Sequence, residues 1–209
     1  MKQIAFPAGE GFEIKLAPAI AYTRAYLLAN GTRGFNLDQM TGDLHISKKT
    51  LYKYFSTKDE FIEFVLLKIY EEMFADARNV TLEDDDPLKC FYELMKVMFR
   101  HISMISPKTT LDVKLFYPRV WQEVDNFQQE IIDKVLVSFQ KADNLGLLRK
   151  HFDLKFTADL IVKIVRATFQ PETYINAPYT ITEMIHFFVD IMMNGLMKKD
   201  KFFSFTDNE

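Results

Sequence analysis

The sequence feature that most constrains the fold is a pair of short helical patterns separated by only a few residues. The second pattern begins at Ser47, a residue type that caps helix starts. It places Leu51, Tyr54 and Phe55 at positions i, i+3 and i+4, so these side chains share one face of a short helix. The opposite face carries side chains that can all donate hydrogen bonds: Lys48, Lys49, Thr50, Tyr52 and Lys53. This helix is therefore expected to have an apolar back and a basic, hydroxyl-bearing front.

The first pattern lies directly before it. Asn36 is a candidate N-cap, Gln39 completes a capping-box pattern, and apolar residues recur at helical spacing at Leu37, Met40 and Leu44. Because only His45 and Ile46 separate this pattern from the second, the two helices are expected to form a helix-turn-helix, whose second helix reads the major groove of DNA. The basic front suits that task, since lysines neutralise phosphates and hydroxyls reach phosphates or base edges.

The stretch from Leu37 to Glu60 resembles the DNA-binding signature of the TetR family of bacterial repressors. In that family an apolar and a small residue precede an apolar-Ser-Lys segment, a Leu-Tyr pair, an aromatic-Phe pair and a Ser-Lys-Glu-like helix start. Here Met40-Thr41 is followed by the segment from Ile46 to Phe55 and then by residues 56–60, Ser-Thr-Lys-Asp-Glu. Beyond this stretch, the helical plan and the length agree with the family.

Two positions depart from the family pattern. His45 stands where the family usually has Gly in the turn, and Thr41 stands where it usually has Ala. Histidine adopts positive φ more readily than most residues with a side chain, so a strained but accessible turn is expected.

The resemblance implies a homodimer in which each subunit places residues 47–54 in a major groove. Phosphate contacts are then expected from Lys48, Tyr52, Tyr54 and Lys58, and base contacts from Lys49, Thr50 and Lys53. Asn36 and Ser47 complete the predicted DNA-binding set. For Lys58, an ordinary solvated lysine is the alternative interpretation.

The charge distribution agrees with a DNA-binding module more than the total charge does. The whole chain has a formal net charge of −3. Residues 31–58 hold five basic and two acidic side chains, a net charge of +3, which leaves −6 for the rest. A basic module on an acidic body orients a protein on DNA, although such a small excess predicts modest non-specific affinity.

An all-α fold of about nine helices is expected, since apolar residues make up 48% of the chain and only 7 Gly and 7 Pro interrupt it. A three-helix DNA-binding domain is predicted over residues 1–57, with a short N-terminal arm at 1–12 and a first helix over 17–30. Pro18 suits the first turn of this helix, and Gly31 is its expected stop. The arm could reach a minor groove only through Lys2.

A larger helical effector-binding and dimerisation domain is predicted over residues 58–209. Its expected helices cover residues 57–79, 87–105, 109–117, 118–143, 154–169 and 180–198, and a loop is expected at 171–178. The acidic run at 83–86 could bind a hard cation, but a solvated loop in which Asp86 caps the next helix is the preferred interpretation.

The last predicted helix, residues 180–198, is apolar nearly all round, which indicates burial on most sides. A central core helix of a monomer would also explain this pattern. In TetR-like proteins the last two helices form the dimer interface, so the resemblance implies interface positions at Leu160, Ile164, Ile181, Ile185, Phe188 and Met192.

The resemblance also implies an effector pocket among the helices between residues 87 and 169. Met and aromatic side chains are abundant there; they are usually core residues, but they also line sites for apolar ligands. The candidates for a hydrophobic effector are Phe91, Met95, Met98, Phe99, His101, Phe116, Tyr117, Trp121, Phe127, Arg166 and Phe169, among which His101, Tyr117 and Arg166 would orient it.

Catalytic signatures are missing from the sequence: the four histidines are scattered, and there is no Gly-rich phosphate loop or Gly-x-Ser-x-Gly motif. We therefore expect no enzyme, cofactor or metal. The single Cys90 and the lack of a long apolar run suit a cytoplasmic protein without a membrane partner. The expected function is a TetR-like regulator, a repressor that binds an operator in double-stranded DNA and is released by a small hydrophobic effector. The alternative is a helical ligand-binding or scaffolding dimer without functional DNA binding.

Overall fold

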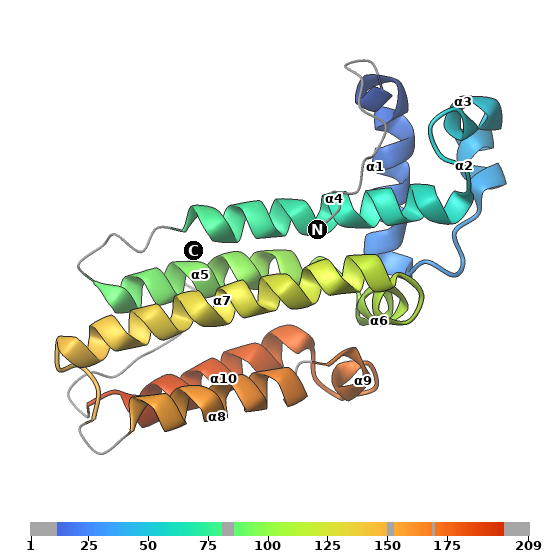
Figure 1. The fold of residues 1–209 in the computed structure, drawn as a ribbon. Coiled ribbons are helices and arrows are strands. Elements are labelled where there is room, and N and C mark those ends of the chain that lie inside the picture. Colours follow the sequence, from blue (N-terminus) through green and yellow to red (C-terminus); the bar gives the residue numbers. More distant parts are fainter. Residues whose placement is uncertain (1–11, 81–85, 150–152, 169, 199–209) are drawn as a thin grey trace. The chain divides into compact units, whose positions relative to one another are not determined.

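The computed structural model describes residues 12–80, 86–149, 153–168 and 170–198, with side chains from Lys15 onward. These residues form helices and no extended strand, apart from an isolated bridge between Leu148 and Met197, which confirms the predicted all-α fold (Figure 1). The helices are α1 (Phe12–Asn30), α2 (Leu37–Asp43), α3 (Lys48–Tyr52), α4 (Lys58–Asn79), α5 (Pro87–Ile102), α6 (Pro107–Phe116), α7 (Pro118–Asn144), α8 (Leu154–Thr168), α9 (Pro171–Tyr174) and α10 (Ile181–Leu196).

The chain divides into two compact units. The first unit comprises residues 1–72 and 104–124, and the second comprises residues 73–103 and 125–209. Two of the three dividing points fall inside long helices, α4 and α7, and the third lies between α5 and α6. The functional boundary predicted between residues 57 and 58 stays a prediction, since these units are defined by compactness alone.

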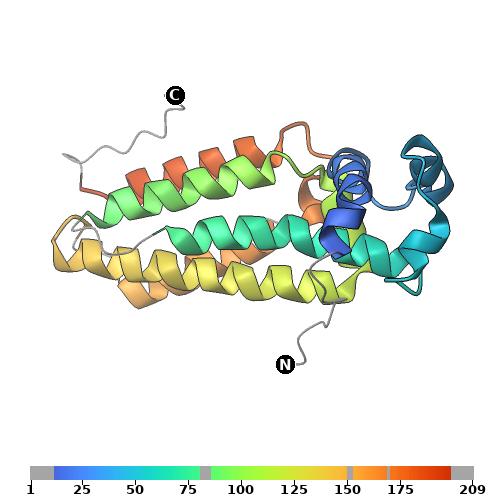
Figure 2. The ribbon, with the colours of Figure 1, turned by 90° about the horizontal axis from the view of Figure 1, so that it is seen from above.

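The first unit is built around the N-terminal part of α4, which α1 crosses at a steep angle (Figures 1 and 2). Phe55 lies at its centre, with ring centroids 5.1 Å from Phe61 and 5.3 Å from Phe64. Met40 from α2 and Leu51 from α3 are fully buried in the same unit. The apolar backs of both short helices are therefore buried within this unit, which is what keeps such short helices folded.

The second unit packs around a cluster of apolar side chains from α5, α7, α10 and the segment after α7. Its buried members are Phe91, Phe139, Ala142, Leu148, Val189, Met193, Leu196 and Met197. Helix α10 lies along α5, and α8 lies along α7 (Figures 1 and 2). Lys134 of α7 caps the C-terminal end of α4 in this unit. Its Nζ donates to the carbonyls of Ala77, Arg78 and Val80 at 3.0–3.1 Å.

Two predictions of local structure were wrong. Helix α1 begins at Phe12 rather than near Ala17, so Pro18 lies inside it. Burial of Leu16 and Ala19 on the same helix explains why packing overrides the preference of proline for a first turn. Residues 171–178, predicted as a loop, contain the short helix α9, in which Pro171 occupies the first turn and both Pro171 and Tyr174 are buried.

The predicted recognition helix is shorter than its apolar pattern suggested. Helix α3 ends at Tyr52, and the amides of Tyr54 and Phe55 both donate to the Leu51 carbonyl, at 3.0 and 3.1 Å. Phe55 still reaches the core, because this tight end of the helix keeps its side chain on the buried face. Among the helices in the described ranges, none is long and apolar enough to cross a membrane.

Candidate nucleic-acid interface

The two helices of the motif are capped by their own side chains. The Asn36 side-chain oxygen accepts hydrogen bonds from the amides of Asp38 and Gln39, at 2.9 and 3.2 Å, and Ser47 Oγ accepts from the Thr50 amide at 3.2 Å. These bonds satisfy amides that the first turn of a helix leaves without partners. Asn36 and Ser47, both predicted to bind DNA, are thus first of all the residues that start α2 and α3.

The turn between the helices has the strained residue that the sequence predicted. His45 has a φ of +52°, a conformation that costs energy for a residue with a side chain. The turn is closed by backbone bonds from His45 to the Gly42 carbonyl and from Ile46 to the Thr41 carbonyl, at 3.2 and 3.1 Å. Thr41 is buried and its hydroxyl donates to the Asp38 carbonyl at 3.1 Å, which explains how a hydroxyl is accommodated where the family has Ala.

The front of α3 is open to solvent. Lys48, Lys49, Tyr52 and Lys53 are exposed, whereas Leu51 beneath them is fully buried. Tyr52 is 47% exposed. Thr50 is half-buried, and its hydroxyl lies 2.9 Å from Ser47 Oγ. Lys48 and Lys49 therefore project from one short, capped helix, and Lys53 follows at its C-cap.

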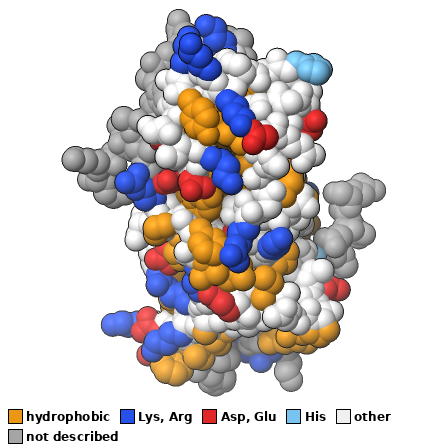
Figure 3. All heavy atoms as spheres, turned by 90° about the vertical axis from the view of Figure 1, so that its right-hand side faces the viewer, with side chains coloured by type: hydrophobic (Ala, Val, Ile, Leu, Met, Phe, Trp, Pro, Cys, Tyr) orange, Lys and Arg blue, Asp and Glu red, His pale blue; other side chains and the backbone are white. Residues whose placement is uncertain are grey.

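Figure 3 views the side on which α2 and α3 lie in Figure 1, and shows Lys and Arg side chains interspersed with acidic and apolar ones. One acidic side chain, Asp38 from α2, forms an ion pair with Lys48 from α3. Both side chains are largely exposed, so solvent screens this pair and it contributes little to stability. Sequence reasoning missed Asp38, although its place ten residues before Lys48 in a helix-turn-helix could have indicated the contact.

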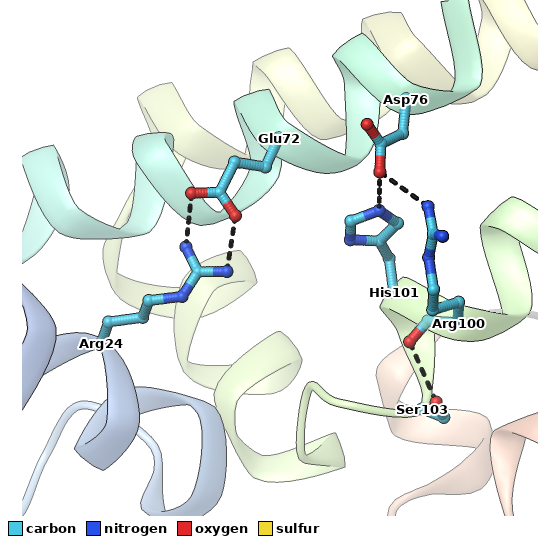
Figure 4. A network of polar contacts seen from close by, with 6 residues as sticks. All are labelled: Arg24, Glu72, Asp76, Arg100, His101 and Ser103. Atoms are coloured by element: carbon cyan, nitrogen blue, oxygen red, sulfur yellow. Dashed lines mark hydrogen bonds and ion pairs between the residues drawn. The ribbon is translucent and has the colours of Figure 1, made fainter. Parts of the chain in front are cut away.

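Lys58 is not a freely solvated lysine, and its contact with a phosphate stays a prediction. Its Nζ donates to the Phe35 carbonyl at 3.3 Å, and its side chain is half-buried. A second link within the first unit joins α1 to α4, where Arg24 makes two hydrogen bonds of 2.9 and 2.6 Å to the Glu72 carboxylate (Figure 4). The Lys58 contact holds the segment just before α2, and the Arg24 contact joins α1 to α4. Both contacts therefore stabilise the elements next to the motif.

The predicted dimer positions fall into two groups. Leu160 and Ile164 on α8 are exposed, whereas Ile185, Phe188 and Met192 on α10 pack against the core of their own unit and Ile181 is buried. The exposed apolar residues of α10 are instead Phe187 and Ile191, at 70% and 57%. Sequence reasoning missed these two because a helix that is apolar all round does not reveal which face its own core uses.

Helix α8 carries a matching exposed stripe. Phe156, Leu160 and Ile164 recur every four residues and are all exposed, and no residue of α8 is buried. A helix with such a pronounced apolar side rarely stays uncovered in a folded protein. Phe156 was also missed, although its spacing from Leu160 and Ile164 was visible in the sequence.

The predicted effector residues are divided between the two units. Phe116, Tyr117 and Trp121 belong to the first unit, most of the others belong to the second, and Phe169 lies outside the described residues. Phe116 is exposed beneath the Arg33 guanidinium, 5.1 Å from its ring centroid, and the Lys114 ammonium lies 5.6 Å from the Trp121 ring. The predicted effector site stays a prediction.

Within the second unit, several of these residues form the core. Phe91 and Phe127 are buried, and Phe127 stacks on Phe74 with centroids 4.0 Å apart. Phe99 contacts the His186 ring at 4.1 Å, while Met95 packs on the core cluster. Met98 is half-buried, and the Arg166 guanidinium donates to the Gln129 side-chain oxygen at 2.6 Å.

His101, predicted to orient an effector, is buried against Asp76. Its Nε2 lies 2.8 Å from the Asp76 carboxylate, which also accepts a 2.7 Å hydrogen bond from Arg100 (Figure 4). The hydrogen bond from His101, with help from the Arg100 charge, lowers the pKa of Asp76. In the first unit, burial and the nearby carboxylates of Asp59, Asp112 and Glu63 raise the pKa of Tyr117 to about 12, so its hydroxyl stays protonated at neutral pH.

A search for metal ligands among the described side chains found no group of three or more His, Cys, Asp or Glu residues placed to hold an ion. The acidic run considered as a cation site lies almost entirely outside the described residues. Its last member, Asp86, caps α5 by accepting from the amides of Leu88 and Lys89, at 3.0 and 3.2 Å, as predicted.

Comparisons with known proteins agree with this geometry. No family model matches the sequence. The chain is 20% identical over 163 residues to the uncharacterized HTH-type transcriptional regulator YvaF of Bacillus subtilis, an alignment that covers 78% of this chain and 85% of that protein.

Solved structures give the same result for the fold. A transcriptional regulator from Cytophaga hutchinsonii superimposes with a TM-score of 0.64 at 16% identity, over 88% of this chain and 99% of that one. The TetR family transcriptional regulator PfmR from Thermus thermophilus superimposes with a TM-score of 0.58 at 16% identity, over 86% and 99%. The fold that the helix-turn-helix resemblance implied is thus confirmed.

Proposed function

We propose that this chain, whose fold is that of the TetR-type transcriptional regulators, is a DNA-binding regulator of transcription that acts as a repressor. The observation that carries the proposal is the front of α3. Its three lysines and Tyr52 are exposed on a helix whose apolar back is fully buried in the first unit. A capped helix with such a front has the chemistry that neutralises phosphates and reaches base edges, and it has no evident role in the core of its own chain.

In this proposal, Lys49 and Lys53 read bases and Lys48 and Tyr52 hold phosphates. Lysine binds the O6 and N7 acceptors of guanine in the major groove, so a G·C pair is the expected target of each reading lysine. Lys48 must exchange its contact with Asp38 for one with a phosphate, which an exposed ion pair does at little cost.

The proposed regulator is a homodimer. The exposed apolar stripe Phe156, Leu160 and Ile164 on α8, together with Phe187 and Ile191 on α10, supports an interface through these two helices. A two-fold symmetric dimer places the same surface on both subunits. Its two α3 helices would then contact half-sites about 34 Å apart, or a multiple of that, on a nearly palindromic operator.

A small hydrophobic effector is proposed to release the regulator from DNA. The Met and Phe side chains of α5 and the Phe side chains of α7 in the second unit support this, because such residues can line sites for apolar ligands. DNA and effector would oppose each other through one coupling free energy, so each lowers the affinity for the other by the same factor. A cytoplasmic location belongs to the same proposal.

The test is a fluorescence-anisotropy titration of the purified chain against DNA from around its own gene, at two salt concentrations, with scrambled DNA as the control. Tighter, salt-sensitive binding to the native fragment is the expected result. Tyr52→Phe and Lys53→Ala should weaken that binding, whereas Lys96→Ala, which removes an exposed lysine from α5, should not.

Two outcomes would contradict the proposal. Unchanged affinity in both α3 variants would exclude this face as the DNA-binding surface. Absence of binding to any DNA, even at low salt, would favour a helical ligand-binding dimer whose motif has lost its function. The ion pair between Lys48 and Asp38 and the strained His45 are the features that would then explain the loss.

A further inference from the structure

Helix α6 completes the end of α1, although the two helices are far apart in sequence. The last carbonyls of a helix have no amide partner within it. Here the Ser106 amide donates to the Leu28 carbonyl at 2.8 Å, and the Thr109 hydroxyl donates to the Leu27 carbonyl. Thr109 is itself almost fully buried, so this contact belongs to the core of the first unit. The N-terminal end of α6 thus caps the C-terminal end of α1.

The next turn of α6 holds the connection that follows α1. Asp112 Oδ2 accepts from the Thr32 amide at 2.6 Å, the Thr32 hydroxyl at 3.1 Å and the Arg33 amide at 3.4 Å. Asp112 is only 4% exposed and Thr32 only 3%. A buried carboxylate is tolerated only where donors surround it, and charge-assisted hydrogen bonds of this kind are stronger than neutral ones.

Gly31 shows how closely the connection is fitted to this carboxylate. Its φ of +79° is one that residues with a side chain rarely adopt. A Cβ at this position would also lie 2.6 Å from Asp112 Oδ2 and 3.0 Å from Lys108 Cγ. The backbone therefore approaches α6 too closely for any other residue, which indicates a specific contact rather than a loop that happens to pass nearby.

The held connection leads directly into the DNA-binding motif. The Phe35 amide donates to the Thr32 carbonyl at 3.2 Å, and the Phe35 carbonyl accepts from Lys58 at 3.3 Å. The next residue, Asn36, is the N-cap of α2. Asp112 on α6 and Lys58 on α4 thus hold Thr32 and Phe35, two points of the connection that leads from α1 to α2.

We propose that Asp112 is a positioning residue for DNA recognition: it fixes the α1–α2 connection and with it the orientation of the helix-turn-helix relative to α1. The inference rests on the proposed function. Base contacts require the reading side chains to be placed accurately, whereas contacts of mobile lysines with phosphates tolerate displacement. Loss of the Asp112 contacts should therefore reduce the preference for the operator more than the general affinity for DNA.

The test compares full-length Asp112→Leu and Asp112→Asn with the unmodified chain, on operator and on scrambled DNA, at a temperature where all three are folded by circular dichroism. Asp112→Leu removes the acceptor, and we expect its operator affinity to fall by about tenfold or more, with binding to scrambled DNA within about twofold. Asp112→Asn keeps an acceptor oxygen at the same place, so it should restore most of the preference.

Val189→Ala is the matched control, because it destabilises the second unit by removing buried methyl groups without touching α6. It should lower the melting temperature and leave the operator preference unchanged. Should Asp112→Leu fail to fold, Thr32→Val removes one of the three donors, and a smaller loss in the same direction is expected.

The outcomes separate the two proposals. Full operator preference in Asp112→Leu, or an equal loss in Val189→Ala, would overturn the positioning role while leaving the regulator intact. An equal fall on operator and scrambled DNA would also overturn it, since that is the effect of a general loss of structure. Failure of the unmodified chain to bind any DNA would overturn both proposals together.

Discussion

The front of α3 and the outer face of α8 and α10 are both exposed, but the first is charged and the second is apolar. The first is a five-residue helix bearing lysines, and it is held by caps at its start and by aromatic packing beneath it. The second is a pair of long helices bearing Phe, Leu and Ile, and α8 has no buried residue of its own. A polar front is well hydrated in water and can bind a charged partner, whereas a large apolar face is stabilised by being covered.

The largest effect is expected at the apolar face. Leu160→Glu combined with Ile191→Glu places a charge on each helix where the proposed interface would have to bury it, and burying an unpaired charge is costly. We expect the dimer to weaken by roughly a hundredfold or more, measured by sedimentation velocity over a range of concentrations.

Val137→Glu is the control for this prediction, because it adds the same charge at an exposed apolar position on α7. A dimer that survives the double substitution would exclude α8 and α10 from the interface.

A smaller effect is expected at the polar front of α3, where a substitution should strengthen binding rather than weaken it. Asp38→Asn frees Lys48 from its ion pair and removes a negative charge close to the phosphates. Binding to scrambled DNA should tighten by about two- to fivefold at low salt, with a steeper salt dependence.

The matched variant is Asp43→Asn, which neutralises an acid at the other end of α2 that accepts a 2.9 Å hydrogen bond from Tyr22. An equal gain in both variants would indicate a general charge effect rather than competition for Lys48. A loss of affinity in Asp38→Asn would make Asp38 itself a contact to DNA.

We expect that the stability of the second unit can be lowered without altering DNA binding by the front of α3. Lys134→Met removes the ammonium that caps the carbonyls of Ala77, Arg78 and Val80 while keeping a stem that packs similarly. The free energy of unfolding should fall by about 1–2 kcal/mol, measured by urea denaturation. Operator affinity measured well below the transition should stay the same, and a parallel loss would show that the regions are coupled.

The smallest effect concerns acid stability. The hydrogen bonds from Arg78 lower the pKa of Glu130, so the pair stabilises the fold above the ordinary glutamate pKa, and this contribution is lost as the pH falls through the lowered value. In Glu130→Gln the melting temperature should therefore depend slightly less on pH between about 5 and 3. Identical pH profiles would show that solvent screening leaves this exposed pair without measurable effect.

The features that sequence predicted well are local ones. The caps Asn36, Ser47 and Asp86, the end of α1 at Gly31 and the strained His45 all depend on residues within a few positions of each other. Such short-range hydrogen bonds and backbone preferences are present in the sequence as spacing, so they need no knowledge of the tertiary fold.

The features that sequence did not predict depend on distant partners. Asp112 contacts Thr32 across 80 residues, and nothing near either residue indicates the other. The outward face of α10 could not be chosen, because Ile185 and Phe188 are as apolar as Phe187 and Ile191, and only the position of the unit's own core separates them. The same holds for Pro18, where packing of neighbouring residues decides against the local preference.

The discontinuity of the first unit sets the order in which a newly made chain can mature. Residues 12–72 leave the ribosome well before residues 104–124, so the end of α1 and the connection that follows it lack their partners on α6 until then. Synthesis proceeds at about 5–20 residues per second, so this interval lasts seconds. The contacts that hold the connection before α2 are therefore completed only after about half of the chain has emerged.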